Sequence, residues 1–208
     1  MGDCSPYLDC ARHERGFAVS ADNRTRVAVL LSGRGSNLKA LIDAEQDAYD
    51  ITLVVSNVED AGGLAIARAA GIATFALAHK GIARAEFDAI VDAQLRDHRI
   101  EAVALAGYMR ILSPEFVERW AGRMINVHPS LLPLYKGLHT HERAIEAGDA
   151  QGGCSVHLVT AGLDDGPVLA QAAVPILQGD TADTLAARVL VEEHRLYPRA
   201  LADLVRTL

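Results

Sequence analysis

The chain has 208 residues, enough for one domain with a sizeable hydrophobic core. Apolar residues make up 50% of it, and no apolar run approaches the roughly 20 residues that a membrane span requires. The formal net charge of -7 argues against broad binding to nucleic acid, because such proteins gather Lys and Arg to neutralise phosphates. We therefore expect a globular protein without a membrane or nucleic-acid partner.

Residues 1–24 mix charges with Cys, Ser and Gly and lack the apolar segment of a secretory signal. We expect a disordered N-terminal extension here, followed by a single domain over residues 25–208. The three cysteines, Cys4, Cys10 and Cys154, are too few for a disulfide scaffold, and the first two show no metal-ligand spacing. A reducing, cytoplasmic location is the simplest inference from this cysteine usage.

From Arg26 onward, short aliphatic runs alternate with amphipathic stretches, which predicts a parallel sheet with helices on both faces. A hairpin around the Asp-Asp-Gly-Pro turn at residues 164–167 and a long final helix from near Thr181 should complete the fold. The strands are predicted at residues 26–31, 51–56, 74–77, 102–106, 123–127, 155–159 and 168–174. The earlier helices are predicted at residues 37–48, 64–70, 84–96, 114–120 and 142–147.

The first predicted strand leads into a helix through the turn Ser32-Gly33-Arg34-Gly35-Ser36-Asn37. Glycines allow a tight turn, and the free N–H groups of a first helical turn can bind a phosphate or another anion. Leu38 stands where a dinucleotide fingerprint needs its third glycine, so a monophosphate fits this turn better than a pyrophosphate. The alternative is an ordinary turn in which Ser36 or Asn37 caps the helix.

Asn126 and His128 project to one side of the strand that is predicted to end at Val127. The segment from Pro129 to Pro133 then prevents further regular pairing, and such strand ends carry the functional groups in open α/β sheets. The structural alternative is that both side chains only form hydrogen bonds within a turn.

Two other chemistries are conceivable from the residues around this segment. His139 and His141 could ligate zinc with His128 or His157, but neither H-E-x-x-H nor paired cysteines accompany them, which favours a hydrogen-bonded loop. A hydrolase triad of Ser130, His128 and Asp164 is also imaginable, although Ser130 lies outside any G-x-S-x-G turn.

Several ordered blocks over most of the chain give a specific family match. They are the turn at residues 32–38, Leu-Ala-Gly-Tyr-Met-Arg-Ile-Leu-Ser-Pro at 105–114, Asn-Val-His-Pro-Ser-Leu-Leu-Pro at 126–133, Gly-Leu-His-Thr-His at 137–141, Gly-Cys-Ser-Val-His at 153–157, Leu-Asp-Asp-Gly-Pro at 163–167 and Glu-His at 193–194. From Arg26 to about Leu201 the chain resembles the small, folate-dependent phosphoribosylglycinamide formyltransferases. The resemblance implies an α/β fold of the formyltransferase, Rossmann-like type, with a mostly parallel central sheet.

This resemblance also implies roles for individual residues. Asn126, His128 and Asp164 would be catalytic, and Glu193 would contact the ribose of the substrate. The phosphate would be held by Gly33, Arg34, Gly35, Ser36 and Asn37. The folate pocket would comprise Arg84, Met109, Arg110, Ile111, Leu112, Val117, Asn126, Thr160, Ala161, Gly162, Leu163 and Asp164.

The implied reaction moves the formyl group of the co-substrate 10-formyltetrahydrofolate to the amine of 5′-phosphoribosylglycinamide in purine biosynthesis, with no metal required. The amine attacks the formyl carbonyl, and negative charge develops on its oxygen in a tetrahedral intermediate. Asn126 and protonated His128 are suitable donors to that oxygen, and Asp164 can favour the charged imidazole and assist proton transfer. The protein would act on these small molecules as a monomer or a homodimer.

Some of these residues also have purely structural interpretations. Met109, Ile111 and Leu112 could be core at a strand end, while Arg84 and Glu193 could be solvated helix charges. Arg110 among apolar neighbours is costly to bury alone, so it needs an anionic or pterin-bearing partner or a structural ion pair.

Other functions remain open at this level. A 10-formyltetrahydrofolate hydrolase would share the catalytic residues, but such proteins usually carry an extra N-terminal domain. Methionyl-tRNA formyltransferases share the His-Pro-Ser-Leu-Leu-Pro core and normally add a C-terminal domain that contacts nucleic acid. A catalytically silent folate or nucleotide sensor would bind without turnover. An NAD-linked oxidoreductase would need an acidic residue at the end of the second strand, where Ser56 and Asn57 stand.

Overall fold

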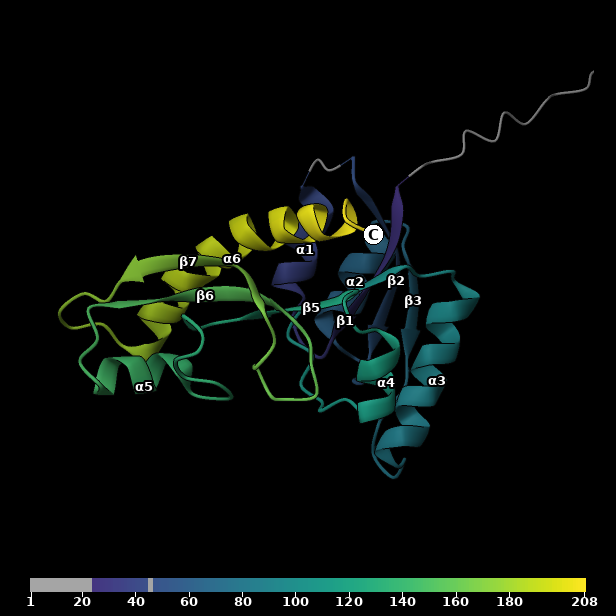
Figure 1. The fold of residues 1–208 in the computed structure, drawn as a ribbon, viewed down its shortest axis with the longest axis horizontal. Helices are drawn as coiled ribbons and strands as arrows, with labels where there is room; N and C mark the ends of the chain where they lie inside the picture. The colour runs from purple at the N-terminus through teal and green to yellow at the C-terminus, as the bar shows by residue number, and fades with distance from the viewer. Residues whose placement is uncertain (1–23, 45–46) are drawn as a thin grey trace, which may run out of the picture.

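The computed structural model describes residues 24–44 and 47–208, which form a seven-stranded sheet in the order β3-β2-β1-β4-β5-β6-β7 (Figure 1). The first five strands pair in parallel, whereas β6 is antiparallel to both β5 and β7. The strands are β1 (Thr25–Leu31), β2 (Tyr49–Ser56), β3 (Ala73–Ala76), β4 (Ala102–Leu105), β5 (Met124–His128), β6 (Gln151–Leu158) and β7 (Val168–Pro175). The predicted parallel sheet and C-terminal hairpin are therefore confirmed.

The helices also occur where the sequence predicts them, with ends within two residues of the prediction except for the end of the first helix. They are α1 (Ser36–Asp43), α2 (Gly62–Ala69), α3 (Arg84–Asp97), α4 (Pro114–Arg119), α5 (Thr140–Glu146) and α6 (Ala182–Val205). The first helix was predicted to reach Ala48 but ends at Asp43. Ala44 is already extended, and the carbonyl of Ala48 accepts a hydrogen bond from the amide of Thr25, so residue 48 serves the sheet edge instead.

The predicted extension over residues 1–24 lies outside the described residues except for Arg24, as do Cys4 and Cys10. Cys154 is a free, buried thiol in β6. Among the described helices, none is long and apolar enough to cross a membrane.

Alternate side chains of β1 serve two hydrophobic layers. Val27, Val29 and Leu31 face α1, α2 and the second half of α6, whereas Ala28 and Leu30 face α3 and α4. This alternation follows from the two-residue period of a strand, and it confirms that helices cover both faces. Burying each such Val or Leu stabilises the fold by roughly 1.5 to 3 kcal/mol.

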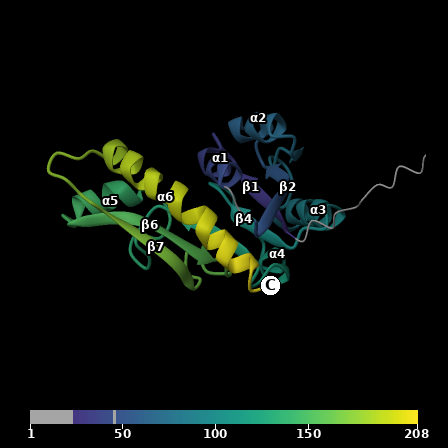
Figure 2. The same ribbon diagram turned by 90° about the horizontal axis from the view of Figure 1, so that it is seen from above.

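Helix α6 ties the hairpin to the parallel strands, because it runs from α5 along β6 and β7 to the neighbourhood of α1 (Figure 2). A capping box between Thr181 and Thr184 fixes its start. Farther along, the buried hydroxyl of Tyr197 donates to the carbonyl of Leu105, 2.8 Å away at the end of β4. The helix is therefore anchored beside the carboxyl ends of the parallel strands.

The polar side chains of β5 lie on the face of the sheet opposite α6. Ile125 and Val127 belong to the layer under α1 and α6, so Asn126 and His128 point to the opposite face, as predicted. There the helical layer of α3 and α4 covers the parallel strands, and the loop between β6 and β7 lies beneath the sheet between α4 and α5 (Figure 1). Asn126 and His128 of β5 therefore face the loop between β6 and β7.

Candidate active site

The turn between β1 and α1 offers unpaired backbone donors. Gly35 adopts a left-handed conformation (φ 82°) at the N-cap of α1, where no side chain caps the helix. The N–H groups of the first helical turn are therefore available to an anion. Gly33, Arg34 and Ser36 are exposed around this turn. Among the described residues, neither Ser36 nor Asn37 caps the helix, and a phosphate site at this turn stays a prediction.

The Gly35→Ala variant should lose about 2 to 4 kcal/mol of unfolding free energy. A Cβ at this position would lie 2.5 Å from Cα of Gly63 at the start of α2, and the positive φ of residue 35 would add strain. Urea unfolding followed by circular dichroism measures the loss. Gly33→Ala is the matched control, because its Cβ would meet nothing within 4 Å. Equal stability of the two variants would contradict the close-packing argument.

Glu193 of α6 reaches the same end of the sheet. Its carboxylate accepts a 2.7 Å hydrogen bond from the side-chain amide of Asn37, and the residue is only 7% exposed. The interpretation of Glu193 as a solvated helix charge is therefore wrong. Burial raises the pKa of Glu193, and the hydrogen bond from Asn37 opposes that rise in part. The amide oxygen of Asn37 is buried without a partner among the described residues.

The segment after β4 lies beside this turn. The hydroxyl of Ser32 accepts a hydrogen bond from the amide of Met109, and the amide of Ser32 donates to the carbonyl of Gly107. Met109 and Ile111 are 66% and 62% exposed, which rules out the alternative that they are core. Leu112 is half-buried against the layer of α3 and α4. The segment from Met109 to Leu112 thus presents apolar side chains at the surface next to the β1–α1 turn.

Arg110 has a structural partner, as the sequence allowed. Its guanidinium lies 4.5 Å from the ring centre of Phe87 and 3.9 Å from the carboxylate of Asp88. Arg84, the exposed first residue of α3, also interacts electrostatically with Asp88. Val117, which was predicted to line the folate pocket, is 8% exposed and packs in the core.

The predicted catalytic residues converge on the face of the sheet opposite α6. Nδ1 of His128 lies 3.4 Å from Oδ2 of Asp164, which comes from the loop between β6 and β7. The amide of Asn126 does not contact either group directly, but it lies 3.2 Å from Nε2 of His157. The same Nε2 is 3.6 Å from Oδ1 of Asp164. Asn126, His157, Asp164 and His128 therefore form one continuous polar chain.

Backbone groups hold both ends of the Asp164–His128 pair. The carboxylate of Asp164 accepts a 2.9 Å hydrogen bond from the amide of Gly137, and Nε2 of His128 donates to the carbonyl of Tyr135 at 3.0 Å. Both neighbours of the His128 ring, a carbonyl and a carboxylate, are hydrogen-bond acceptors. Asp164 itself has φ 48°, a strained value for a non-glycine residue.

The pKa of Asp164 is lowered by its surroundings. Burial alone would raise this pKa, but the hydrogen bonds from His157 and from the amide of Gly137, with the charge of His128, outweigh the burial. The carboxylate form is therefore the one that this site favours, which suits a group that accepts protons and pairs with an imidazolium.

His157 is the site residue that sequence reasoning placed only as a conceivable zinc ligand. It stands directly opposite Asn126 in the antiparallel register of β5 and β6, and its Nδ1 donates to the carbonyl of Leu158. Its remaining nitrogen accepts from Asn126 when the ring is neutral and donates to Asp164 when the ring is charged. A buried His in an apolar strand was the available signal, but the sequence did not show the register that pairs it with Asn126.

The loop that carries Asp164 supplies the other predicted folate contacts. Thr160, Ala161, Gly162 and Leu163 are exposed. A Cβ at Gly166 would lie 1.8 Å from the carbonyl oxygen of Leu158, so this glycine permits the loop to return close to β6. The loop thus places an apolar and a carboxylate side chain, Leu163 and Asp164, in succession.

The zinc and hydrolase interpretations receive no geometric support. Within the described ranges, no group of three His, Cys, Asp or Glu side chains could hold a metal ion, and the exposed His139 lies 3.6 Å from Glu142. The hydroxyl of Ser130 donates to the carbonyl of Leu134 at 2.6 Å, a contact within the turn. Ser130 therefore has a structural partner and is not arranged as a nucleophile on His128.

The fold is that of a doubly wound α/β protein, and an amide, imidazole rings and a carboxylate lie together at the end of β5. The model of the formyl transferase family matches residues 25–201, and the chain belongs to this family. The predicted resemblance is thereby confirmed.

Individual relatives agree with this assignment. Phosphoribosylglycinamide formyltransferase of Escherichia coli is 48% identical over 85% of both chains. The crystal structure of phosphoribosylglycinamide formyltransferase from Brucella melitensis is 49% identical, with a TM-score of 0.82 over 88% of this chain and 96% of that one. The trifunctional purine biosynthetic protein adenosine-3 of Drosophila melanogaster is 48% identical over 89% of this chain, which spans only 14% of that protein's length.

Proposed function

We propose that this chain transfers the formyl group of 10-formyltetrahydrofolate to the amine of 5′-phosphoribosylglycinamide; the acceptor is the one in its relatives' name, phosphoribosylglycinamide formyltransferase. The observation that carries the proposal is the contact of His128 with Asp164 on the polar chain that starts at Asn126. We further propose a cytoplasmic enzyme that handles these small molecules as a monomer or homodimer.

In the proposed mechanism, the neutral amine attacks the formyl carbon, and a tetrahedral intermediate carries negative charge on the former carbonyl oxygen. The side-chain amide of Asn126 has two N–H groups, of which one faces His157. We assign the second to the developing oxyanion, with the positive charge of His128 nearby. Such a donor contributes most when it is preorganised, and the pairing of β5 with β6 fixes the backbone of Asn126.

A proton must leave the attacking amine and reach the folate nitrogen before the bond from that nitrogen to carbon breaks. Asp164 is the base that its lowered pKa keeps ionised, and it can pass the proton through water. The products are the formylated amine and tetrahydrofolate. No covalent enzyme intermediate is required by this sequence of steps.

Substrate recognition is divided between two regions in this proposal. Gly33, Arg34, Gly35, Ser36 and Asn37 would bind the phosphate, and Glu193 would accept hydrogen bonds from the ribose hydroxyls. Arg84, the strip from Met109 to Leu112 and the loop from Thr160 to Asp164 would surround the folate. The exposed apolar side chains of Met109, Ile111 and Leu163 support this placement, because a pterin offers flat apolar faces to cover them.

Glu193→Gln should stabilise the protein while weakening substrate binding. The raised pKa of Glu193 means that the folded state disfavours its charged form, so an uncharged amide removes a cost present at neutral pH. Gln could also donate to the partnerless oxygen of Asn37. We expect a gain of about 1 kcal/mol in urea unfolding at pH 7. The KM for the ribonucleotide should rise roughly tenfold because the ribose hydroxyls lose a charged acceptor.

The pH dependence provides the control for Glu193. As the pH falls through the raised pKa, wild-type Glu193 becomes protonated, so the stability advantage of Glu193→Gln should shrink. A variant that is less stable than wild type at pH 7, or an unchanged KM, would contradict the assigned role.

A spectrophotometric assay of 10-formyltetrahydrofolate deformylation tests the proposed function directly. Turnover that depends strictly on 5′-phosphoribosylglycinamide is the expected result. Turnover without the ribonucleotide would instead identify a hydrolase. Folate binding without any turnover would identify a sensor.

A further inference from the structure

The turn formed by residues 135–139 contacts two of the candidate catalytic side chains through its backbone. The carbonyl of Tyr135 accepts from His128, and the amide of Gly137 donates to Asp164. The conformation is unfavourable for two non-glycine residues, because Tyr135 and His139 have positive φ values of 53° and 58°; Gly137 between them has φ 79°. A turn of this shape persists only where the surrounding contacts hold it.

Arg143 on α5 supplies the most extensive of those contacts. Its Nη1 donates to the carbonyl of Lys136 at 2.8 Å and to the carbonyl of Leu138 at 3.3 Å, on either side of Gly137. Its guanidinium also lies 5.2 Å from the ring centre of Tyr135, whose hydroxyl donates to Asp149 at 2.6 Å. One planar group therefore touches the turn at three of its residues.

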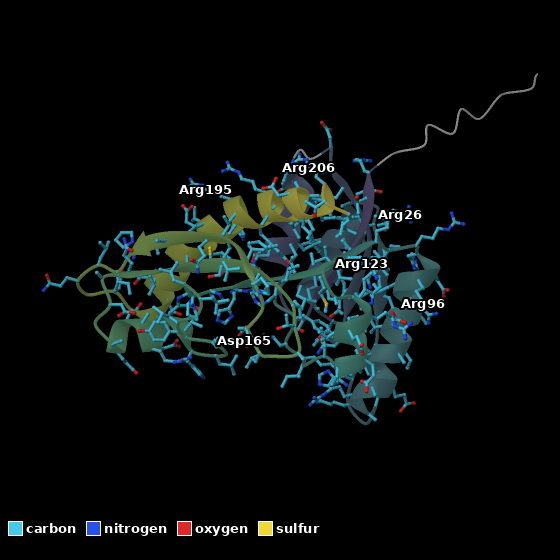
Figure 3. All side chains as sticks on the ribbon, in the orientation of Figure 1. Arg26, Arg96, Arg123, Asp165, Arg195 and Arg206 are labelled. Atoms are coloured by element: carbon cyan, nitrogen blue, oxygen red, sulfur yellow. The ribbon has the colours of Figure 1, made fainter. Side chains whose placement is uncertain are left out.

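A second link crosses the outside of the same turn. Lys136 donates to Asp165, the residue after the candidate base, and Asp165 lies beneath the sheet in Figure 3. This ion pair is largely exposed, with Asp165 64% accessible, so it contributes little by itself. Arg143 is therefore the residue through which the position of Gly137 can be changed without altering a group that touches Asp164 or His128.

We propose that Arg143 is a positioning residue for formyl transfer, holding the 135–139 turn so that its backbone keeps His128 and Asp164 in their reactive arrangement. This inference rests on the proposed function. Arg143 does not touch the reacting atoms in this assignment; it acts through the carbonyl of Tyr135 and the amide of Gly137.

Removing Arg143 should change the pH dependence of kcat in a specific way. When the turn relaxes, Asp164 loses the hydrogen bond from Gly137 that helps to lower its pKa. The charged and titratable groups around Asp164 and His128 are His157 from β6, His141 from α5, and Lys136 and Asp165 beside the turn. None of these is altered by the substitution. The acid limb of kcat should therefore move to higher pH.

The experiment compares Arg143→Met with Arg206→Met. Arg206 also makes an exposed ion pair, with Asp203, but it lies on the opposite side of the sheet from Asp165 (Figure 3). We expect kcat of Arg143→Met to fall roughly tenfold, with KM for the ribonucleotide nearly unchanged, whereas the control behaves as wild type. Arg143→Lys, which keeps the charge but lacks the planar group, should lie between them and serves if Arg143→Met folds poorly.

A double-mutant cycle and an NMR titration complete the test. In an Asp164→Asn background, Arg143→Met should have a clearly smaller effect than in wild type, because the route through the amide of Gly137 and the Asp164 carboxylate is already lost. NMR titration of the Asp164 carboxyl without substrate should show a higher pKa in Arg143→Met. An unchanged titration, or a full effect of Arg143→Met in the Asp164→Asn background, would overturn the proposal. The titration does not depend on turnover, so it stays informative even if the wild-type chain fails the formyl-transfer assay.

Discussion

Asp164→Asn should keep the fold and lose roughly 100- to 10,000-fold in kcat. The substitution retains the shape of the side chain but removes the negative charge that faces His128 and His157 at 3.4 and 3.6 Å. An amide is no base, so it cannot take the amine proton, and it no longer favours a charged imidazole. Steady-state kinetics of formyl transfer at saturating substrates measures the loss.

The pH dependence of stability separates a chemical role from a folding defect. Because the pKa of Asp164 is lowered in the folded protein, its carboxylate stabilises the fold at neutral pH, and this contribution is lost as the pH falls through that lowered pKa. The difference in unfolding free energy between wild type and Asp164→Asn should therefore close in acid. Wild-type kcat in a folded Asp164→Asn protein would exclude Asp164 as the base.

His128→Ala should cost roughly 100- to 1,000-fold in kcat, with smaller changes in KM. His128 contributes positive charge beside the oxyanion, an interaction that strengthens only as the tetrahedral intermediate forms. Its loss also removes a neighbour that lowers the pKa of Asp164, so the residual activity should require a higher pH. The kcat–pH profile of the variant records both effects.

His98→Ala is the matched control for His128→Ala. His98 follows α3, and its ring contacts only the carbonyl of Gln94 among the described hydrogen bonds, so its removal should leave kcat unchanged. An active, correctly folded His128→Ala enzyme would refute the proposed role of the imidazole.

The architecture was predictable because its signals are local. Each parallel strand is a short aliphatic run next to an amphipathic stretch, and both the β6–β7 hairpin and α6 appear where the turn at residues 164–167 and Thr181 indicate. The end of α1 was missed because Ala48 is a good helix former whose carbonyl is nevertheless taken by Thr25, 23 positions earlier in the chain. A contact at that separation leaves no trace in a local pattern.

The sequence pointed to Asn126, His128 and Asp164 as site residues. It did not show most of the contacts that link them. Glu193 looks like a surface charge until the packing of α6 buries it against Asn37. His157 joins Asn126 to Asp164 only because the antiparallel register sets it opposite Asn126. The contributions of Tyr135 and Gly137 come from backbone atoms, which no residue-type motif encodes.

The position of the candidate catalytic side chains between β5 and the β6–β7 loop bears on how this family could diversify. The residues proposed for the chemistry all come from positions 126–164, whereas those proposed to recognise the acceptor come from the β1–α1 turn and α6. Evolution could therefore exchange the amine that receives the formyl group by altering the turn and helix while leaving the reaction chemistry intact. The exposed loop could vary in the same way to accommodate different folate tails, since loops tolerate insertions better than the strands that they connect.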